Sequence, residues 1–262
     1  MSQATPDTAS PLTVVIVHGA FTDASSWMGL GGHALFGHGV DGVIERLQQQ
    51  GLRVIAPPNP LRGVRADSAY LVSLLNQIDC PVLLVAHSYG GAVTSNAGAK
   101  ASNVVGLVYV AALIPEEGER LADVQSKDSI INPLLIARHY PTGSDGETAP
   151  EFTIDPAHFR RGFAADVPEE RTRLMAATQC PIAGAAFADT SGAVAWKTLP
   201  SWAIIATEDV GAGTDIVRSM AQRAGAKVTE LKGSHAIMIS QPQAVATVIV
   251  EAAQFVSQPD RG

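Results

Sequence analysis

Residues 80–92 read Cys-Pro-Val-Leu-Leu-Val-Ala-His-Ser-Tyr-Gly-Gly-Ala, a hydrophobic run that passes into small residues with Ser88 at the corner. A strand ending at Ala86, followed by a helix that opens at paired glycines, is the context in which a Gly-x-Ser-x-Gly pattern forms a nucleophile elbow. Here Ala86 replaces the first glycine and Gly90 supplies the second, so both positions remain small. The alternative is a serine in an ordinary strand-to-helix turn or at a helix cap.

Short β-branched runs recur along the chain with helical stretches between them. Runs of this kind are typical of buried parallel strands, and they fall at 13–17, 52–56, 82–86, 104–110, 202–206 and 227–231. Helix formers or a 3.6-residue apolar spacing occupy 43–50, 66–78, 91–100, 214–224 and 243–256. The alternation predicts an α/β fold with a doubly wound, mostly parallel sheet.

One interval, residues 115–199, breaks this alternation. It contains no convincing strand, and its prolines stand around short helical patterns at Pro133, Pro141, Pro150, Pro156, Pro168 and Pro181. The pattern predicts a helical cap inserted between two core strands. The domain prediction is a discontinuous core at 11–114 and 199–258, a cap at 115–198, an insertion loop at 28–40 and a flexible N-terminus at 1–10.

A serine nucleophile needs a base and a group that orients the base, because a hydroxyl is a weak nucleophile at its ordinary pKa. Two later strands are followed by such residues, Asp209 after the strand at 202–206 and His235 after the strand at 227–231. Parallel sheets place their sites at the carboxyl ends of the strands. The prediction is a triad of Ser88, Asp209 and His235, with Glu208 or Asp215 as the alternative acid.

The tetrahedral intermediate of acyl transfer also needs hydrogen-bond donors for its oxyanion. The first strand runs into His18-Gly-Ala20, a turn of small residues whose backbone N–H groups can point into the site. We expect the donors to be the N–H groups of Ala20 and of Tyr89, the residue after the nucleophile. His18 is expected to support this loop rather than act as a base.

Composition and charge exclude several classes of function. The chain has 262 residues, 46% of them hydrophobic, and a net charge of -7, which gives no positive patch for nucleic acid or anionic membranes. No apolar run approaches the length of a membrane helix, and the N-terminus lacks a signal-peptide pattern. Two cysteines, Cys80 and Cys180, form neither a disulfide framework nor a metal spacing. The expectation is a soluble, cytoplasmic protein without a metal, with a homodimer as the default oligomer.

At this point the sequence resembles the compact α/β-hydrolase superfamily, in the branch of small bacterial esterases, plant methylesterases and hydroxynitrile lyases. The resemblance covers most of the chain and rests on residues 17–27, 86–91, 109–119, 200–209 and 232–242. It implies a hydrolase without a cofactor that acts on carboxylic esters with small or moderately bulky groups. The order Ser88, Asp209, His235 is also the order of this superfamily.

Related activities differ from this sequence at single positions. Lyases of the branch typically carry a threonine after the first-strand histidine and a lysine after the catalytic histidine, where this chain has Gly19 and Ala236. Cyanohydrin cleavage is therefore disfavoured. Dehalogenases and epoxide hydrolases of the superfamily use an aspartate at the elbow, so Ser88 argues against both.

Residues 28–40 form an insertion relative to that branch. Its glycines and the apolar pair Leu35 and Phe36 are compatible with a flap over the pocket, and equally with a surface loop. The segment 29–34 also spells Gly-x-Gly-x-x-Ala, but no strand precedes it, which disfavours a dinucleotide site. His33 and His38 lack companion ligands and are expected to be solvated.

The predicted substrate pocket draws its residues from two parts of the chain. Phe21 and Trp27 lie close to the predicted chemistry along the chain. Several cap residues are candidates for the pocket lining, although packing of cap against core is the alternative for most of them: Leu134, Leu135, Phe159, Phe163 and Met175.

Three classes of function fit the sequence. A serine esterase with a small-molecule ester substrate comes first, and a cofactor-free lyase or perhydrolase on the same triad is second. The third is a ligand-binding protein that retains the triad. The sequence does not distinguish an ester from a lactone or thioester, because all three share the acyl-transfer step.

Overall fold

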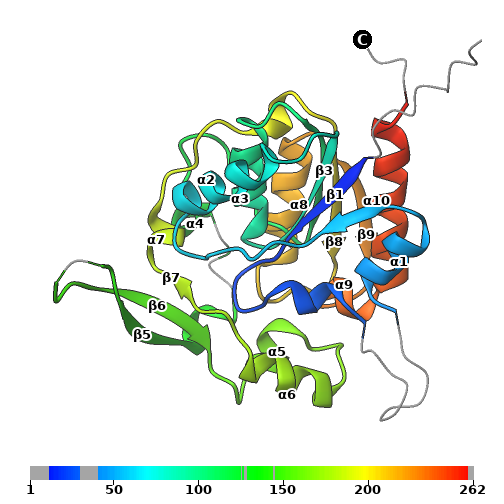
Figure 1. Ribbon diagram of the computed structural model, residues 1–262. Helices are drawn as coiled ribbons and strands as arrows, with labels where there is room; N and C mark the ends of the chain where they lie inside the picture. Colours follow the sequence, from blue (N-terminus) through cyan, green and yellow to red (C-terminus); the bar gives the residue numbers. More distant parts are fainter. Residues whose placement is uncertain (1–11, 30–40, 125, 127–128, 144, 259–262) are drawn as a thin grey trace, which may run out of the picture.

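The computed structural model describes residues 12–29, 41–124, 126, 129–143 and 145–258. Within them, six parallel strands form one sheet in the order β2-β1-β3-β4-β8-β9 (Figure 1). The strands are β1 (Thr13–Val17), β2 (Arg53–Ile55), β3 (Val82–His87), β4 (Val104–Val110), β8 (Ser201–Ala206) and β9 (Lys227–Leu231). The predicted doubly wound parallel sheet is confirmed, and each strand ends within one residue of its predicted bounds.

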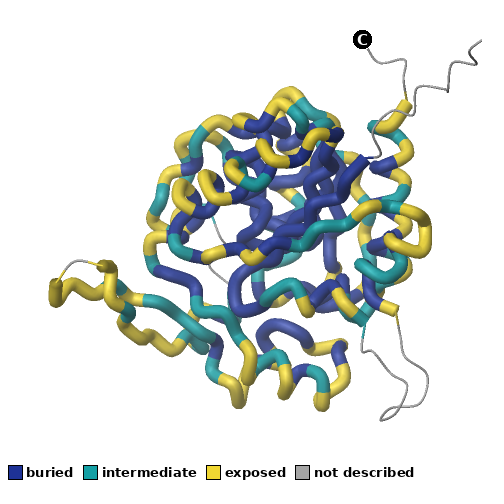
Figure 2. The backbone as a smooth tube through the Cα atoms, in the orientation of Figure 1, coloured by how far each residue is buried: buried dark blue, intermediate teal, exposed yellow. Residues whose placement is uncertain are grey.

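Two hydrophobic cores lie on opposite faces of this sheet. Side chains alternate between them along the central strands; in β1, Val15 and Val17 belong to one core and Val14 and Ile16 to the other. Helices α1 (Val43–Gln49) and α10 (Pro242–Val256) cover one face, and α2 (Val64–Leu75), α3 (Gly90–Gly98) and α8 (Thr214–Arg223) cover the other (Figure 1). Because both faces are covered, the central strands β1, β3, β4 and β8 are buried almost throughout, as the buried centre of Figure 2 shows, whereas the edge strands β2 and β9 are partly exposed.

The strand register brings one set of strand ends together. Val17 of β1 pairs with Ala86 of β3, and Ala206 of β8 pairs with Leu231 of β9. The loops that follow β1, β3, β8 and β9 therefore emerge along the same edge of the sheet. This edge is the place where chemistry-bearing side chains from distant parts of the chain can meet.

The segment between β4 and β8 is an insertion, as predicted, but it is not purely helical. It holds short helices at α4 (Leu121–Val124), η2 (Asn132–Leu134), α5 (Phe159–Phe163), α6 (Glu169–Ala177), α7 (Ala185–Ala188) and η3 (Ala195–Lys197). It also holds a three-stranded antiparallel sheet of β5 (Leu135–Pro141), β6 (Thr148–Ile154) and β7 (Ile182–Ala183), whose hairpin extends away from the core (Figure 1). The expectation of no strand in this interval is wrong.

The physical reason for this error is the exposure of the hairpin. Most residues of β5 are exposed, so the strand carries no apolar run that would mark it in the sequence. Proline ends β5 at Pro141 and occurs inside β6 at Pro150, where the sequence indicates a break. The hairpin is held by backbone pairing over its whole length, from Leu135 opposite Ile154 to Pro141 opposite Thr148.

Two predicted segments fall outside the description. Residues 30–40, which make up most of the predicted insertion loop at 28–40, and 1–11, which include the predicted flexible N-terminus, are not among the described residues. The same holds for His33 and His38.

Candidate active site

Ser88 occupies the turn between β3 and α3 in a strained backbone conformation. Its φ of 52° lies in the left-handed region, which residues other than glycine rarely adopt. A Cβ atom on Gly90 would lie 2.7 Å from the carbonyl oxygen of Val17, and one on Gly91 would lie 2.5 Å from that of Leu113. The chain can make this turn only with glycine at both positions, and the turn holds Ser88 at the carboxyl edge of the sheet.

Hydrogen bonds join Ser88, His235 and Asp209 in a row. His235 Nδ1 lies 2.7 Å from Asp209 Oδ2, and His235 Nε2 lies 2.8 Å from Ser88 Oγ. Because a carboxylate only accepts, the Nδ1–H group donates to Asp209, which leaves Nε2 to accept from the serine hydroxyl. The side chains of His235 and Asp209 are 3% and 1% exposed, so the pair is shielded from water.

The loop after β8 fixes the position of the Asp209 carboxylate. Its Oδ1 atom accepts hydrogen bonds of 2.9 Å from the N–H groups of both Gly211 and Ala212, which leaves Oδ2 for His235. The alternative acids point elsewhere. Glu208 lies 3.6 Å from Lys232 with its side chain 54% exposed, and Asp215 lies against Arg218 with its side chain 96% exposed.

The backbone N–H groups expected to bind the oxyanion belong to residues beside Ser88. Ala20 and Tyr89 line the same cavity as Ser88 and His235. Within the described parts of the chain, neither N–H group donates to a backbone carbonyl in a turn or loop. The arrangement is compatible with two donors directed at a substrate oxygen.

Asp67 on α2 binds the side chain of Tyr89, the residue after Ser88, and the sequence prediction does not include it. Its buried carboxylate accepts a hydrogen bond of 2.7 Å from the Tyr89 hydroxyl and further ones from the N–H groups of Arg62 and Gly63. Burial raises the pKa of Asp67, and burial together with the adjacent carboxyl raises the pKa of the Tyr89 phenol. An aspartate inside a helix gives no sequence signal for such a role.

Two further histidines are buried near the site, and both are held in the neutral form. Burial lowers the pKa of His18, whose Nε2 accepts from the N–H group of Asn59 at 2.9 Å. Burial, reinforced by the neighbouring His235, lowers the pKa of His87 well below its ordinary value. His87 donates its Nε2–H to the carbonyl oxygen of His235 at 3.0 Å. His18 thus braces the loop after β1, as expected.

The cavity at Ser88 is small, with a volume of ≈ 60 Å³. Of the predicted pocket residues, Phe21, Leu135 and Phe163 line it. Trp27 and Phe159 do not: Trp27 lies in the core beneath α1, and Phe159 packs behind Phe163 at a ring-centroid distance of 5.1 Å. The lining also includes residues that the sequence prediction omits, namely Leu113, Ile131, Asn132 and Phe187.

Residues of the cap form hydrogen bonds and a ring contact with the loop that carries His235. The N–H group of Ala236 donates to the carbonyl oxygen of Phe163 at 3.1 Å, and the Phe163 ring lies edge-on to the imidazole at 5.0 Å. Asp166 accepts hydrogen bonds from both the N–H group, at 3.1 Å, and the hydroxyl of Ser234. The position of His235 therefore depends on the cap as well as on β9.

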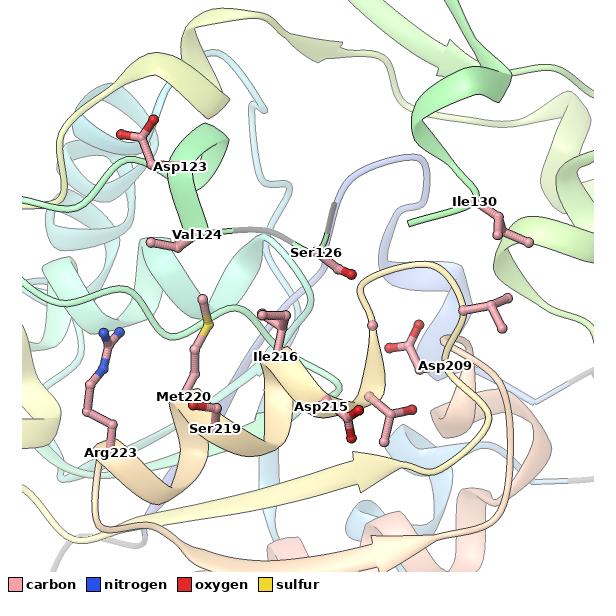
Figure 3. Close-up of a pocket in the computed structure, with 13 residues that line it drawn as sticks. Asp123, Val124, Ser126, Ile130, Asp209, Asp215, Ile216, Ser219, Met220 and Arg223 are labelled. Carbon is pink, nitrogen blue, oxygen red and sulfur yellow. The ribbon is translucent and has the colours of Figure 1, made fainter. Parts of the chain in front are cut away.

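A larger cavity of ≈ 760 Å³ lies on the other side of Asp209, along α8. Figure 3 shows Asp209 at one end of this cavity and Arg223 at the other, with Ile216 and Met220 between them. Neither Ser88 nor His235 lines it, and residue 125, beside its lining residue Val124, is not among the described residues.

The described residues contain no group of three or more His, Cys, Asp or Glu side chains arranged to hold a metal ion. None of the helices in the described parts of the chain is long and apolar enough to cross a membrane.

Comparisons with known proteins identify a family and a fold. The sequence profile of the Alpha/beta hydrolase family matches residues 14–248 of the chain. No curated protein matches the chain in sequence.

Several solved structures share the fold at low sequence identity. A methylesterase, MES16, from Arabidopsis is 19% identical with a TM-score of 0.73, over 94% of this chain and 100% of the other. Polyneuridine aldehyde esterase is 17% identical with a TM-score of 0.75, over 93% and 100% of the two chains. A pyrethroid hydrolase from Sphingobium faniae JZ-2 is 20% identical with a TM-score of 0.71, over 93% and 98%.

Proposed function

This chain belongs to the alpha/beta hydrolase family, and we propose that it is a serine hydrolase that cleaves carboxylic esters of small to medium size. The observation that carries the proposal is the row of hydrogen bonds from Ser88 through His235 to Asp209. The same three residues follow the carboxyl ends of three strands of one sheet. Structural neighbours named as a methylesterase, polyneuridine aldehyde esterase and a pyrethroid hydrolase also support an ester substrate.

In the proposed mechanism, His235 Nε2 takes the proton of the Ser88 hydroxyl as Oγ attacks the ester carbonyl carbon. Asp209 holds the imidazole in the Nδ1–H tautomer and stabilises the imidazolium that forms. The N–H groups of Ala20 and Tyr89 donate to the carbonyl oxygen as it becomes negative.

The tetrahedral intermediate then collapses into an acyl-enzyme. His235 returns the proton to the departing alkoxide, so the alcohol leaves neutral and Ser88 keeps the acyl group. Water attacks this second ester, with His235 again taking the proton, and the acid is released with Ser88 restored. The step needs no metal or redox partner, because proton transfer and charge stabilisation are supplied by side chains and backbone.

The test compares the wild type with Ser88→Ala and with the control Ser25→Ala, an exposed serine on η1 (Ala24–Trp27). We expect wild type and control to hydrolyse ethyl acetate and p-nitrophenyl acetate and to take up a fluorophosphonate label. The label should be on Ser88 by peptide mass analysis. In Ser88→Ala, labelling should vanish and turnover should fall by about a thousandfold or more.

The other outcomes separate the alternative classes of function. Labelling of Ser88 without ester turnover would indicate a lyase or a perhydrolase on the same triad. Wild-type protein with neither labelling nor turnover would refute the activated serine and favour a ligand-binding protein.

A further inference from the structure

A second and larger apolar cavity adjoins the one at Ser88. We name it the vestibule; its volume is ≈ 410 Å³, and it is lined by Asn132, Leu135, Pro150, Phe152, Gly184 and Phe187. Three of these residues, Asn132, Leu135 and Phe187, also line the cavity at Ser88. The two spaces therefore lie next to each other, with these three side chains at their common boundary.

The two cavities differ in volume, so they can hold groups of different size. Pockets that enclose a whole small molecule typically have volumes of about 300–1,000 Å³. The cavity at Ser88, at ≈ 60 Å³, is far below that range, and the vestibule, at ≈ 410 Å³, lies inside it. A group of very few atoms fits beside the serine, whereas a long or bulky group fits only in the vestibule.

The chemistry of the vestibule selects apolar groups. Its lining contains no charged side chain, and three large apolar side chains, Leu135, Phe152 and Phe187, are each left partly exposed. Apolar surface left in water is unfavourable, so an apolar ligand that covers it gains free energy. Backbone contacts hold the two segments that line the vestibule against each other. Gly184 donates its N–H to the carbonyl oxygen of Pro150 at 2.9 Å, and Phe152 of β6 pairs with Ile182 of β7.

From these observations, and resting on the proposed function, we propose that the substrate is an asymmetric ester. One side of the ester bond is very small and lies in the cavity at Ser88. The other side is an extended apolar group that occupies the vestibule, whose lining includes residues of β6 and α7.

Three isomeric ten-carbon esters test this asymmetry at nearly constant hydrophobicity: methyl nonanoate, octyl acetate and pentyl pentanoate. The first two have one very small side, on the alcohol or the acyl part, and the third divides its carbons evenly. We expect kcat/KM for at least one of the first two to exceed that for pentyl pentanoate by about tenfold or more, the range of a well-buried apolar group. Equal values for all three would overturn the proposal.

A matched pair of variants tests the vestibule itself. Phe152 lines the vestibule and not the cavity at Ser88, while Ile136, on the neighbouring strand, is 38% exposed and lines neither. Phe152→Ala should lower kcat/KM for the preferred long ester by about tenfold, mainly through KM, and change that for ethyl acetate by less than about twofold. Ile136→Ala should change neither. Equal losses on both esters in a folded Phe152→Ala protein would contradict the assignment.

A binding measurement keeps this inference separate from the proposed function. The neutral fluorescent probe N-phenyl-1-naphthylamine is titrated into wild type, Ser88→Ala, Phe152→Ala and Ile136→Ala, and then displaced with 1-octanol. We expect binding to weaken by about tenfold in Phe152→Ala alone. With this result, absence of ester turnover would refute the hydrolase and retain the apolar site. Probe binding that Phe152→Ala leaves unchanged would refute the vestibule, whatever the turnover.

Discussion

At the scale of single residues, Ser88 shows how backbone strain and packing produce reactivity. Its positive φ separates the serine from the regular geometry of β3 and α3 and presents the hydroxyl to His235 Nε2. Strain of this kind costs about 1–3 kcal/mol and persists only where the surroundings enforce it. Here the enforcement is steric, since Gly90 lies directly against the backbone of β1.

Substitution of Gly90 by alanine should therefore damage the site more than a typical helix substitution does. The added methyl group would lie 2.7 Å from the Val17 carbonyl oxygen and 3.0 Å from that of His18, and these are backbone atoms that cannot move aside as a flexible side chain can. We expect Gly90→Ala to lower kcat by about a hundredfold and stability by about 2–4 kcal/mol, measured by ester turnover and urea unfolding. In the control, Gly162→Ala on α5, the nearest contact is a flexible Leu134 methyl group at 3.4 Å, and both quantities should stay near wild type.

A second question at this scale is which carboxylate orients His235. Asp209 and Glu208 both follow β8 and can be compared directly. Only Asp209 contacts His235, while Glu208 lies near Lys232 at the surface. We expect Asp209→Ala to lower kcat by about a thousandfold to ten-thousandfold, because the imidazole loses the group that fixes its tautomer. Glu208→Ala should remain within about twofold of wild type. Comparable losses in the two variants would refute Asp209 as the orienting group.

The site residues that sequence could reveal are those with a local pattern. Ser88 has its small neighbours, and Asp209 and His235 have their places after strands. Asp67 and Phe187 have no such pattern, because their places near Ser88 depend on how α2 and the cap fold back over the sheet edge. Trp27 illustrates the converse, since it is near Ala20 along the chain yet points into the core beneath α1.

At the scale of elements, the core strands were predictable and the cap strands were not, for one physical reason. A strand covered on both faces is hydrophobic throughout, as β3 and β4 are, and this signal survives in a single sequence. The β5–β6 hairpin has few buried residues and is defined mainly by backbone pairing, which any sequence without a strong alternative can adopt. The same partial exposure leaves apolar side chains free to line the vestibule.

A second feature at this scale is the contact between Asp166 of the cap and Ser234, which precedes His235 in the loop after β9. Burial tends to raise the pKa of Asp166, but the hydrogen bonds from Ser234 hold it below its ordinary value, so the carboxylate is charged near neutral pH. We expect Asp166→Ala to lower kcat by about tenfold with little change in KM, because the two hydrogen bonds that hold Ser234, next to His235, are lost.

Two further variants distinguish positioning from general loss of stability. Asp166→Asn keeps one acceptor oxygen and should recover part of kcat, while Glu170→Ala, an exposed acid on α6, should leave kcat unchanged. If kcat in Asp166→Ala equals that of wild type under conditions where the protein is folded, the cap contact does not position His235.

At the scale of the whole molecule, the two buried histidines connect the site to global stability. His18 and His87 are both neutral in the fold, mainly because burial penalises their charged forms. In the unfolded chain they titrate near the ordinary value of 6.5. Below that pH the unfolded chain binds protons that the folded protein does not, so acid favours unfolding.

The stabilisation from these histidines is therefore present above about pH 6.5 and is lost as the pH falls toward their lowered pKa values in the fold. Between about pH 7.5 and about pH 5.5, the free energy of unfolding should decrease by about 1–3 kcal/mol, as measured by urea unfolding. Most carboxylates titrate below this range, and the Asp67 carboxyl, whose pKa burial raises, acts in the opposite direction and only reduces the decrease. His87→Asn removes one of the two groups and should reduce the decrease by about 1 kcal/mol, whereas His139→Asn, at an exposed position on β5, should not change it. A decrease that His87→Asn leaves intact would show that His87 takes up its proton equally in the folded and unfolded states, which its complete burial beside His235 argues against.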